Sequence, residues 1–316
     1  MSQTAGAEHL LVTPDRQEPA MSERIDAATE TFVDHRNLLF TVAYEMLGSA
    51  ADAEDVLQET WMKWVGVDLD GIRDRRAYLV RITTRQALSR LRTLGRRKES
   101  YIGPWLPEPL LTSPDVAEDI ELADSVSTAM LLVLETLTPT ERAVFVLREV
   151  FDLDYAEIAH AIDKAPAAVR QIAHRARSHV AARRPREVVS AEESSRAIEA
   201  FRNAVETGDL QQFVDMLAPD VVLLGDGGGV VQAVPRPVTG AHRVARILRT
   251  GLPRMRAETS LETAQINGSP ALIFRIGGEI DNVLTVRIDN GLITGLYVVR
   301  NPAKLRRVHQ QTTVSR

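Results

Sequence analysis

The sequence has no cysteine, which excludes disulfide bridges and cysteine-ligated zinc sites. No apolar run approaches the ~20 residues of a membrane-spanning helix, and the polar first twenty residues lack the apolar core of a signal peptide. We therefore expect a cytoplasmic protein with no membrane partner. Helical patterning begins only after Met21, so residues 1–21 are interpreted as a disordered tail and Met21 as an alternative start.

A strong overall charge is also missing, because the net charge of the 316 residues is only −5. The charges are grouped in blocks instead, and such blocks indicate where partners bind. Gly71–Lys98 holds ten Lys or Arg and one acid, whereas Glu99–Glu141 holds nine carboxylates and no Lys or Arg. The basic block predicts an anionic partner. Four prolines between Pro104 and Pro114 prevent a continuous helix in the acidic block and predict a stiff linker.

The residues before the linker predict helices. Ala53–Trp64 has apolar residues at helical spacing after Asp52, which is expected to cap this helix. Asp74–Leu94 has an apolar stripe on one side and a cationic stripe on the other, formed by Arg81, Arg85, Arg92 and Arg96. Tyr78 lies near the start of that second helix, where its ring can stack on an unpaired base. The alternative for Tyr78 is a half-buried core residue.

Asp154–Val180 predicts a helix-turn-helix. Apolar side chains share one face of a first helix, a short turn follows at Asp163–Ala165, and a second helix begins at Pro166. Arg and Gln side chains can bond guanine and adenine edges in the major groove, and flanking arginines can neutralise phosphates. The outward face of the second helix carries Arg170, Gln171, His174, Arg175, Arg177 and Ser178. The alternative is a basic helix that faces only solvent.

The composition changes after Arg186. Short helices are predicted at Ser194–Glu206, Leu210–Leu217 and Ala241–Arg249. Strands of an antiparallel sheet are predicted at Arg256–Ile266, Ala271–Ile276, Ile280–Ile288 and Leu292–Arg300, with a hairpin turn at Asp289-Asn290-Gly291. The predicted fold class is therefore multidomain, with two all-α domains followed by an α+β domain.

Three segments in this order resemble the bacterial extracytoplasmic-function (ECF) sigma factors. They read DAEDVLQETWMKW from Asp52, RAYLVRITTRQALSRLR from Arg76, and TPTERAVFVLREVFDLDYAEIAHAIDKAPAAVRQIAHRAR from Thr138. The motifs WLPEP, DGGG and NPAKL are similar to those of the subgroup with a SnoaL-like carboxy-terminal domain, a cone of helices wrapped by a curved sheet. The expected boundaries are 1–21 tail, 22–98 first helical domain, 99–130 linker, 131–186 second helical domain, 187–305 SnoaL-like domain and 306–316 tail.

The resemblance implies a promoter-recognition subunit of bacterial RNA polymerase, without cofactor, metal or enzymatic activity. Its partners would be promoter DNA and the β′ and β subunits of the core enzyme, and the residues implied to bind the core are Asp52, Asp55, Gln58, Glu59 and Lys63. Residues Asp68–Asp74, Tyr78 and the cationic stripe would read and open the minus-ten element, and the outward face of the second helix in the helix-turn-helix would read the minus-thirty-five element. Many members have Trp at the position of Tyr78 and a Ser cap at the position of Ala165.

A tryptophan in a proline-rich linker suggests a docking segment, because a rigid peptide loses little entropy on binding. We expect Trp105, Leu106 and Pro107 to dock on the SnoaL-like domain at Asp226, Gly227, Gly228, Gly229, Asn301, Pro302, Lys304 and Leu305. Glycines there would permit close backbone approach. Such docking would hold the two DNA-binding domains together and restrain promoter binding. The alternative is a Trp105 that packs only on neighbouring helices.

Other functions stay open for the SnoaL-like domain and for the whole chain. An acid–base enzyme of the cyclase type would draw on Asp226, His242 and Asp281, but a fold does not imply an activity. A small-molecule ligand in an apolar cavity of the cone is the other alternative for this domain. A transcription factor that acts without the polymerase core is an alternative for the chain.

Overall fold

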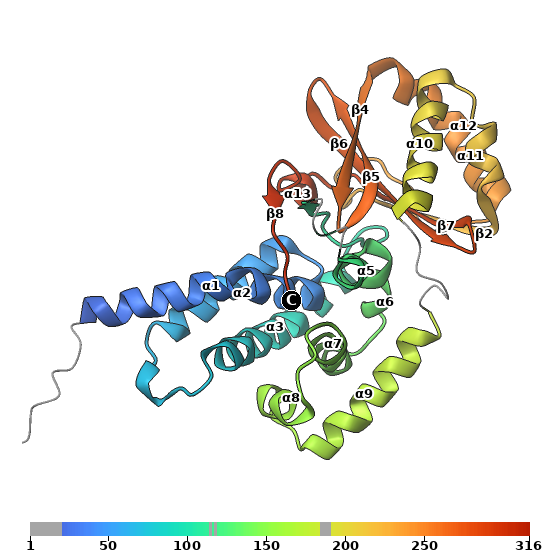
Figure 1. Ribbon diagram of the computed structural model, residues 1–316. Helices are drawn as coiled ribbons and strands as arrows, with labels where there is room; N and C mark the ends of the chain where they lie inside the picture. Colours follow the sequence, from blue (N-terminus) through green and yellow to red (C-terminus); the bar gives the residue numbers. More distant parts are fainter. Residues whose placement is uncertain (1–20, 114–115, 117–118, 184–190) are drawn as a thin grey trace, which may run out of the picture.

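The computed structural model describes residues 21–113, 116, 119–183 and 191–316, so the expected tail over residues 1–20 lies outside the described part. Helices make up the first part of the chain, and a mixed sheet with its own helices makes up the last part (Figure 1). This arrangement confirms the predicted fold class. Within the described residues, no helix combines the length and the apolar composition that crossing a membrane requires.

The amino-terminal helical domain consists of α1 (Met21–Leu47), α2 (Ala50–Trp64), the 3₁₀ turn η1 (Leu69–Gly71) and α3 (Arg75–Glu99). The α2 helix begins three residues earlier than expected, because Ser49 is its N-cap and accepts from the Asp52 amide. The prediction that Asp52 caps this helix is therefore wrong. Asp74 caps α3 by accepting from the Ala77 amide at 2.9 Å.

The middle helical domain consists of α5 (Ile120–Val126), α6 (Thr128–Leu134), α7 (Pro139–Phe145), the π-helical turn η2 (Val146–Val150), α8 (Tyr155–Ile162) and α9 (Pro166–Ala181). The capping box predicted from Thr138 to Glu141 is present at the start of α7. The helix-turn-helix is also confirmed: α8 ends at Ile162, its C-cap Asp163 has a left-handed φ of 56°, and α9 begins at Pro166. Ala165 leaves α9 without a side-chain cap.

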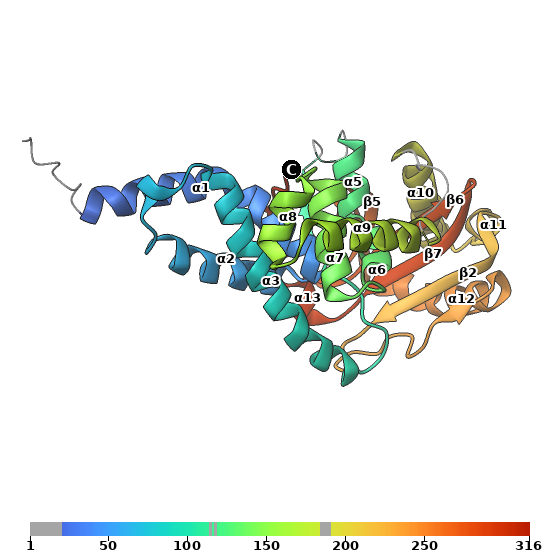
Figure 2. The same cartoon turned by 90° about the horizontal axis from the view of Figure 1, so that it is seen from below.

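The two helical domains share one hydrophobic core, although the sequence suggested two separate units. The shared cluster contains Tyr44 and Leu79 from the amino-terminal helical domain together with Leu131 and Ile158 from the middle helical domain. Helix α8 packs on α3, and α9 packs on α7 and α8 (Figure 1 and Figure 2). The two helical domains are therefore packed together and not merely tethered.

The carboxy-terminal domain is built on an eight-stranded mixed sheet in the order β3-β2-β7-β6-β5-β4-β1-β8. Its own elements are α10 (Ala191–Thr207), α11 (Gln211–Asp215), β2 (Leu217–Asp226), β3 (Val238–Thr239), α12 (Ala241–Glu258), β4 (Thr259–Ile266), β5 (Ser269–Ile276), β6 (Glu279–Asp289), β7 (Leu292–Val299), α13 (Pro302–Leu305) and β8 (Gln311–Thr312). The four predicted strands pair antiparallel as β4 to β7, and the turn between β6 and β7 has positive φ at Asn290 and Gly291. The first of these strands begins at Thr259 and not at Arg256, because α12 runs on to Glu258. The sheet as a whole is not purely antiparallel, since β2 pairs parallel with β7.

The linker contributes a strand to this sheet. β1 (Leu111–Thr112) pairs antiparallel with β4, where Leu111 lies opposite Ile266, and parallel with β8. The carboxy-terminal residues then return to the amino-terminal domain, where Val314 is 4% exposed in the shared helical core. Figure 1 shows the end of the chain lying on these helices. The segment 306–316, expected as a tail, therefore joins two domains.

Candidate nucleic-acid interface and linker site

The α9 helix presents most of its expected minus-thirty-five residues to solvent. Val169, Ile172 and Ala173 are buried on the other face, and the helical period then places five polar side chains outside: Arg170, Gln171, His174, Arg175 and Ser178. Arg175 lies 3.5 Å from Glu141 at the start of α7, and both groups keep solvent contact.

Arg177 differs from the other residues of this face, because its guanidinium is held within the domain. Its Nε donates to Glu149 at 2.8 Å and its Nη2 donates to the Tyr155 hydroxyl at 3.1 Å. These hydrogen bonds raise the pKa of Arg177, Glu149 being the first cause. Arg177 is therefore better placed to orient α9 on α8 than to contact a base.

The cations of α3 differ in their contacts with α8. Arg81, which is half-buried, and Arg85, which is exposed, lie near the start of α3 and both bond to α8. Arg92 and Arg96, near its end, are exposed. Tyr78 is half-buried with its ring 5.9 Å from that of Trp64, and the Arg81 guanidinium lies 4.3 Å from the Tyr78 ring centroid. Arg81 therefore competes with a base for the Tyr78 ring.

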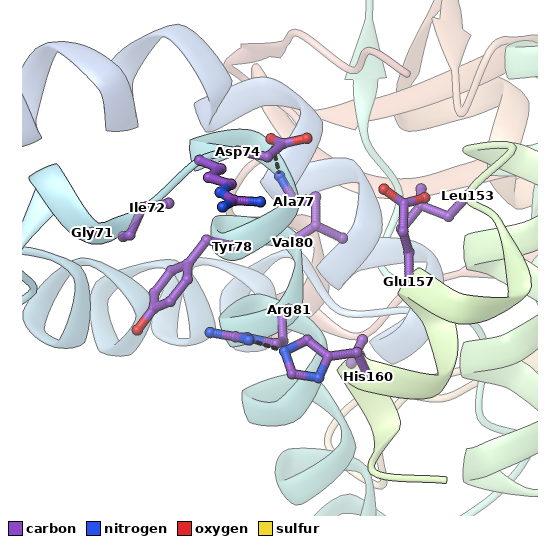
Figure 3. Close-up of a pocket in the computed structure, with 12 residues that line it drawn as sticks. Gly71, Ile72, Asp74, Ala77, Tyr78, Val80, Arg81, Leu153, Glu157 and His160 are labelled. Atoms are coloured by element: carbon purple, nitrogen blue, oxygen red, sulfur yellow. Dashed lines mark hydrogen bonds between the residues drawn. The ribbon is translucent and has the colours of Figure 1, made fainter. Parts of the chain in front are cut away.

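A cavity of about 340 Å³ separates the start of α3 from α8 (Figure 3). Figure 3 shows Tyr78 and Arg81 on one wall and Glu157 and His160 on the other. The expected minus-ten loop contributes Gly71, Ile72, Arg73 and Asp74 to the lining. The residues expected to read the minus-ten element are thus brought together, but the middle helical domain forms the opposite wall of this cavity.

The outer face of α2 is partly used inside the protein. Asp52, expected to bind the polymerase core, is 6% exposed and accepts from Arg90 Nε at 2.8 Å. Lys63 donates to Gln86 at 2.6 Å, and Asp55 pairs with the same Arg90. Asp55, Gln58 and Lys63 are exposed and Glu59 is half-buried, so these four remain accessible to a partner whereas Asp52 does not.

The expected linker contact is present and centres on Asp226, which has 0% exposure. We call this contact the Asp226 site. The carboxylate accepts from the Leu106 amide at 2.9 Å, the Tyr101 hydroxyl at 2.5 Å and the Lys304 ammonium at 2.7 Å. Asn301 donates to the Tyr101 hydroxyl at 2.7 Å, and Lys304 also donates to the Leu106 carbonyl. Burial lowers the pKa of Lys304 against the opposing effect of Asp226.

Trp105 lies between two lysines that belong to different domains. Lys98 Nζ lies 3.5 Å from its ring centroid and Lys304 Nζ lies 4.0 Å from it, both within range of a cation–π interaction. Burial lowers the pKa of Lys98 to about 8, and its partner Glu135 opposes that shift. The contact with Lys304 contradicts the alternative in which Trp105 packs only on its neighbouring helices.

The glycines after Asp226 allow two close approaches. A Cβ on Gly227 would lie 2.2 Å from the Val231 carbonyl oxygen, and one on Gly228 would lie 2.4 Å from Asn301 Nδ2. Gly228 also has a φ of 64°, which a residue with a side chain rarely adopts. Asn301 caps α13 by accepting from the Ala303 amide, so the loop and α13 hold each other beside Asp226. Pro302 is exposed, whereas Leu305 is buried in the core between the linker and the sheet.

A second contact between the domains, which we call the Asn267 site, was not predicted. Asn267 at the turn between β4 and β5 is 1% exposed. Its side chain donates to the Tyr44 hydroxyl at 2.5 Å and to the Val126 carbonyl at 2.9 Å, and accepts from the Leu110 amide at 2.9 Å. Tyr44 donates in turn to the Glu108 carbonyl at 2.7 Å. An Asn-Gly pair signals a hairpin turn, but nothing in the sequence marks this turn as buried.

Ionic contacts extend from the Asp226 site into both helical domains. Glu135 on the turn after α6 bonds Arg142 of α7 and Lys98 of α3. Burial acts to raise the pKa of Glu135, but Arg142 and Lys98 outweigh it and hold the pKa below its usual value. Arg142, which is 2% exposed, also donates to the Glu45 carbonyl at 3.0 Å. One connected network therefore joins all three domains.

The three acid–base candidates of the carboxy-terminal domain have different surroundings. Asp226 is buried against the linker, His242 is exposed on α12, and Asp281 pairs with Arg300 at 2.7 Å.

The core under the sheet is filled by packed aromatic rings, with Phe201 and Phe213 centroids 4.7 Å apart. An open cavity of about 750 Å³ lies beside β4, between α10 and β1. No group of three or more potential metal ligands occurs among the described residues.

Known families match both helical domains. The model of Sigma-70 region 2 matches residues 31–97, and that of Sigma-70 region 4 matches residues 127–180. The ECF RNA polymerase sigma factor SigJ of Mycobacterium tuberculosis is 33% identical over 288 residues, which covers 85% of this chain and 90% of the relative. The probable ECF RNA polymerase sigma factor SigI of the same species is 32% identical over 285 residues, covering 89% of this chain and 95% of the relative.

A solved structure extends the similarity to the sheet domain. The crystal structure of Mycobacterium tuberculosis SigJ superposes with a TM-score of 0.70 at 30% sequence identity, covering 88% of this chain and 98% of that one. The match spans the helical domains and the carboxy-terminal domain that follows them. The chain therefore belongs to the ECF RNA polymerase sigma factors, the proteins that direct bacterial RNA polymerase to promoters to start transcription.

Proposed function

We propose that this sigma factor divides promoter recognition between α3 and α9 and is restrained by its own carboxy-terminal domain. The α9 helix would read the minus-thirty-five element through its five exposed polar residues, with Arg177 in a supporting role. The α3 helix and the loop before it would read the minus-ten element. Asp55, Gln58, Glu59 and Lys63 on α2 would contact the polymerase core in the cytoplasm.

The single observation that carries the restraint is the burial of the linker in the sheet domain. Leu106 is 0% exposed, and its amide and carbonyl are both bonded to the Asp226 site. Further along, Leu111 and Thr112 form strand β1 between β4 and β8. A linker held at so many points cannot let the two helical domains separate freely. We infer that promoter binding by both domains requires release of the linker.

We propose that the carboxy-terminal domain acts as this restraint and not as an enzyme. Its buried carboxylate, Asp226, bonds the linker and is closed to any substrate. The other two acid–base candidates belong to an exposed helix face and to an ion pair, so no constellation for proton transfer is favoured. The open cavity beside β4 is the candidate site for a small-molecule ligand.

The test is transcription in a purified system with core polymerase and a promoter library. Trp105→Ala removes two cation–π contacts and should raise initiation about three- to tenfold at limiting polymerase. Ile276→Ala, at an exposed apolar side chain by the turn between β5 and β6, is the control. Deletion of residues 194–316 should raise initiation further or change promoter choice. Unchanged transcription from both the Trp105 variant and the deletion would contradict the proposed restraint.

A further inference from the structure

The arginines at the start of α3 are already bound to helix α8. Arg85 donates through Nε to the Ala161 carbonyl at 3.1 Å and through Nη2 to the His160 carbonyl at 3.1 Å. Arg81 donates to Nε2 of the His160 ring, and this contact is drawn in Figure 3. Arg85 is exposed, as are Arg92 and Arg96 further along α3, so the bonds to α8 are what distinguish Arg85. The occupied arginines are those beside the loop expected to read the minus-ten element.

The end of α8 offers these arginines the chemistry of a phosphate group. The last carbonyl groups of a helix have no partner within the helix and carry the negative end of its dipole. The α8 helix ends at Ile162, so the carbonyls of His160 and Ala161 lie in its last turn. A guanidinium binds two neighbouring oxygens through parallel N–H donors, as it does on phosphate. Arg85 is held by two such oxygens.

Apolar packing supports this polar contact. Leu153, just before α8, and Ile158 within it belong to the same hydrophobic cluster as Leu79 and Val80 of α3. Glu157 and His160 also line the cavity on which Tyr78 opens. A DNA strand that approaches Tyr78 and Arg81 from this side would meet α8, so the helix must move before the strand can bind.

We propose that the carboxyl end of α8 is an internal substitute for the minus-ten strand, which occupies Arg81 and Arg85 until the middle helical domain moves away. The inference deepens the proposed function and rests on its assignment of the minus-ten element to α3. It names the contact that competes with DNA. Promoter opening would then exchange two carbonyl oxygens for phosphate oxygens on the same guanidinium.

The first experiment measures closure without DNA. The chain has no cysteine, so Met62→Cys and Ala156→Cys place two fluorescent labels at exposed positions of α2 and α8. His160→Lys puts a cation beside Arg81 and should lower energy transfer, whereas His160→Glu adds an ion pair and should keep or raise it. The same two changes at His242, an exposed histidine of α12, are the controls. Equal transfer from His160→Lys and His160→Glu would overturn the contact.

The second experiment measures DNA binding by the full-length free protein. The probe is a short fluorescent single-stranded DNA of randomised sequence, titrated over a range of salt. His160→Ala adds no charge and should raise the affinity about three- to tenfold. The dependence of log K on log salt should steepen by about 0.7, since Arg81 loses its partner while the two carbonyls that hold Arg85 remain. Affinity and slope equal to those of the parent would overturn the proposal.

A double variant separates this inference from the function on which it rests. Arg81→Ala in the His160→Ala background should return the salt slope by about 0.7 and lower the affinity. No change on adding Arg81→Ala would show that Arg81 does not bind DNA, so the minus-ten assignment would fail and the substitute role with it. The energy-transfer result would still report whether α8 closes on α3. Failure of closure and failure of the minus-ten assignment are therefore distinguishable.

Discussion

Two of the sites at which the carboxy-terminal domain holds the rest of the chain differ in character. The Asp226 site is ionic: a buried carboxylate faces Lys304, and Trp105 lies between two ammonium groups. The Asn267 site is formed by neutral groups, the amide of Asn267, the Tyr44 hydroxyl and backbone carbonyls. The first contacts the beginning of the linker. The second joins the end of the linker to both helical domains.

The difference indicates two roles for the two sites. Interactions between charges respond to salt, to pH and to a competing charged partner. Neutral buried hydrogen bonds respond to none of these, and removing one partner leaves the other unsatisfied. We therefore expect the Asn267 site to determine whether the domains stay docked. The Asp226 site would be the one that a partner or a change of conditions can weaken.

The largest effect is expected at the neutral site. Asn267→Ala leaves the Tyr44 hydroxyl, the Val126 carbonyl and the Leu110 amide without their partner, and should cost roughly 3–5 kcal/mol of docking free energy. Asn290→Ala is the matched control, since Asn290 has nearly the same φ, 53° against 54°, in another Asn-Gly turn that is exposed. Denaturant unfolding measures both. Equal losses would attribute the effect to the turn and not to docking.

A smaller effect is expected at the ionic site. Asp226→Asn keeps the shape but leaves the Lys304 ammonium, whose side chain is 11% exposed, without a counter-charge. The loss should be roughly 2–3 kcal/mol, because the ammonium can lose its proton instead of staying charged. Asp281→Asn removes a comparable contact to Arg300 at the protein surface and should cost less than about 1 kcal/mol. Hydrogen exchange at residues 101–112 would show whether the linker is released.

The third prediction concerns pH and a buried acid beside the Asn267 site. Glu45, next to Tyr44 in α1, has 0% exposure and accepts from Ser125 at 2.8 Å, and burial raises its pKa to about 8. The folded protein therefore holds a proton that the unfolded chain releases above a pH of about 4.5. Its stability should fall as the pH rises from about 4.5 to about 8, by up to about 1.4 kcal/mol per pH unit.

Glu45→Gln imitates the protonated acid and should abolish this slope. Unfolding free energies of both proteins across that pH range provide the measurement. A slope that persists in Glu45→Gln would mean that other groups titrate, and Glu45 would then not be the acid that couples α1 to α5. Loss of docking at low pH would likewise contradict the expected sign.

The comparison also separates what a sequence can predict from what it cannot. Helices with caps and an apolar stripe were predictable, as at Thr138 and Pro166, because local rules decide them. The Asp226 site was predictable because its glycines, its aromatic residue and its charged residues form motifs. Asn267 and Val314 belong to no such motif, because their role in docking depends on contacts with residues far away in the sequence. The short strand β1 forms only because β4 and β8 are there to bond it.

The same reasoning explains why two candidate residues have partners inside the protein. Asp52 and Arg177 lie on the polar faces predicted for them, but each meets an opposite charge from a neighbouring helix, Arg90 and Glu149 respectively. A helical period gives the direction of a side chain from its axis. The period does not show whether a side chain of a neighbouring helix is long enough to reach that residue. Surface sites inferred from periodicity alone are therefore weakest where two helices lie side by side.

The smallest effect is expected where the end of the chain returns to α1. Val314 is 4% exposed in the helical core, and the following amide, of Ser315, donates to Thr41 at 3.0 Å. Val314→Ala should cost roughly 1 kcal/mol, whereas Val230→Ala, at a side chain with 76% exposure, should cost almost nothing.

Double variants decide to which site this segment belongs. Thr41 lies one helical turn from Tyr44, and β8 pairs with the linker strand that adjoins Leu110. Val314→Ala should therefore be non-additive with Asn267→Ala, because release of the hairpin turn also loosens the surface that receives Val314. It should be additive within about 0.5 kcal/mol with Asp226→Asn. Additivity with both would make the carboxy-terminal segment a third, independent attachment, and the division into one neutral and one ionic site would be incomplete.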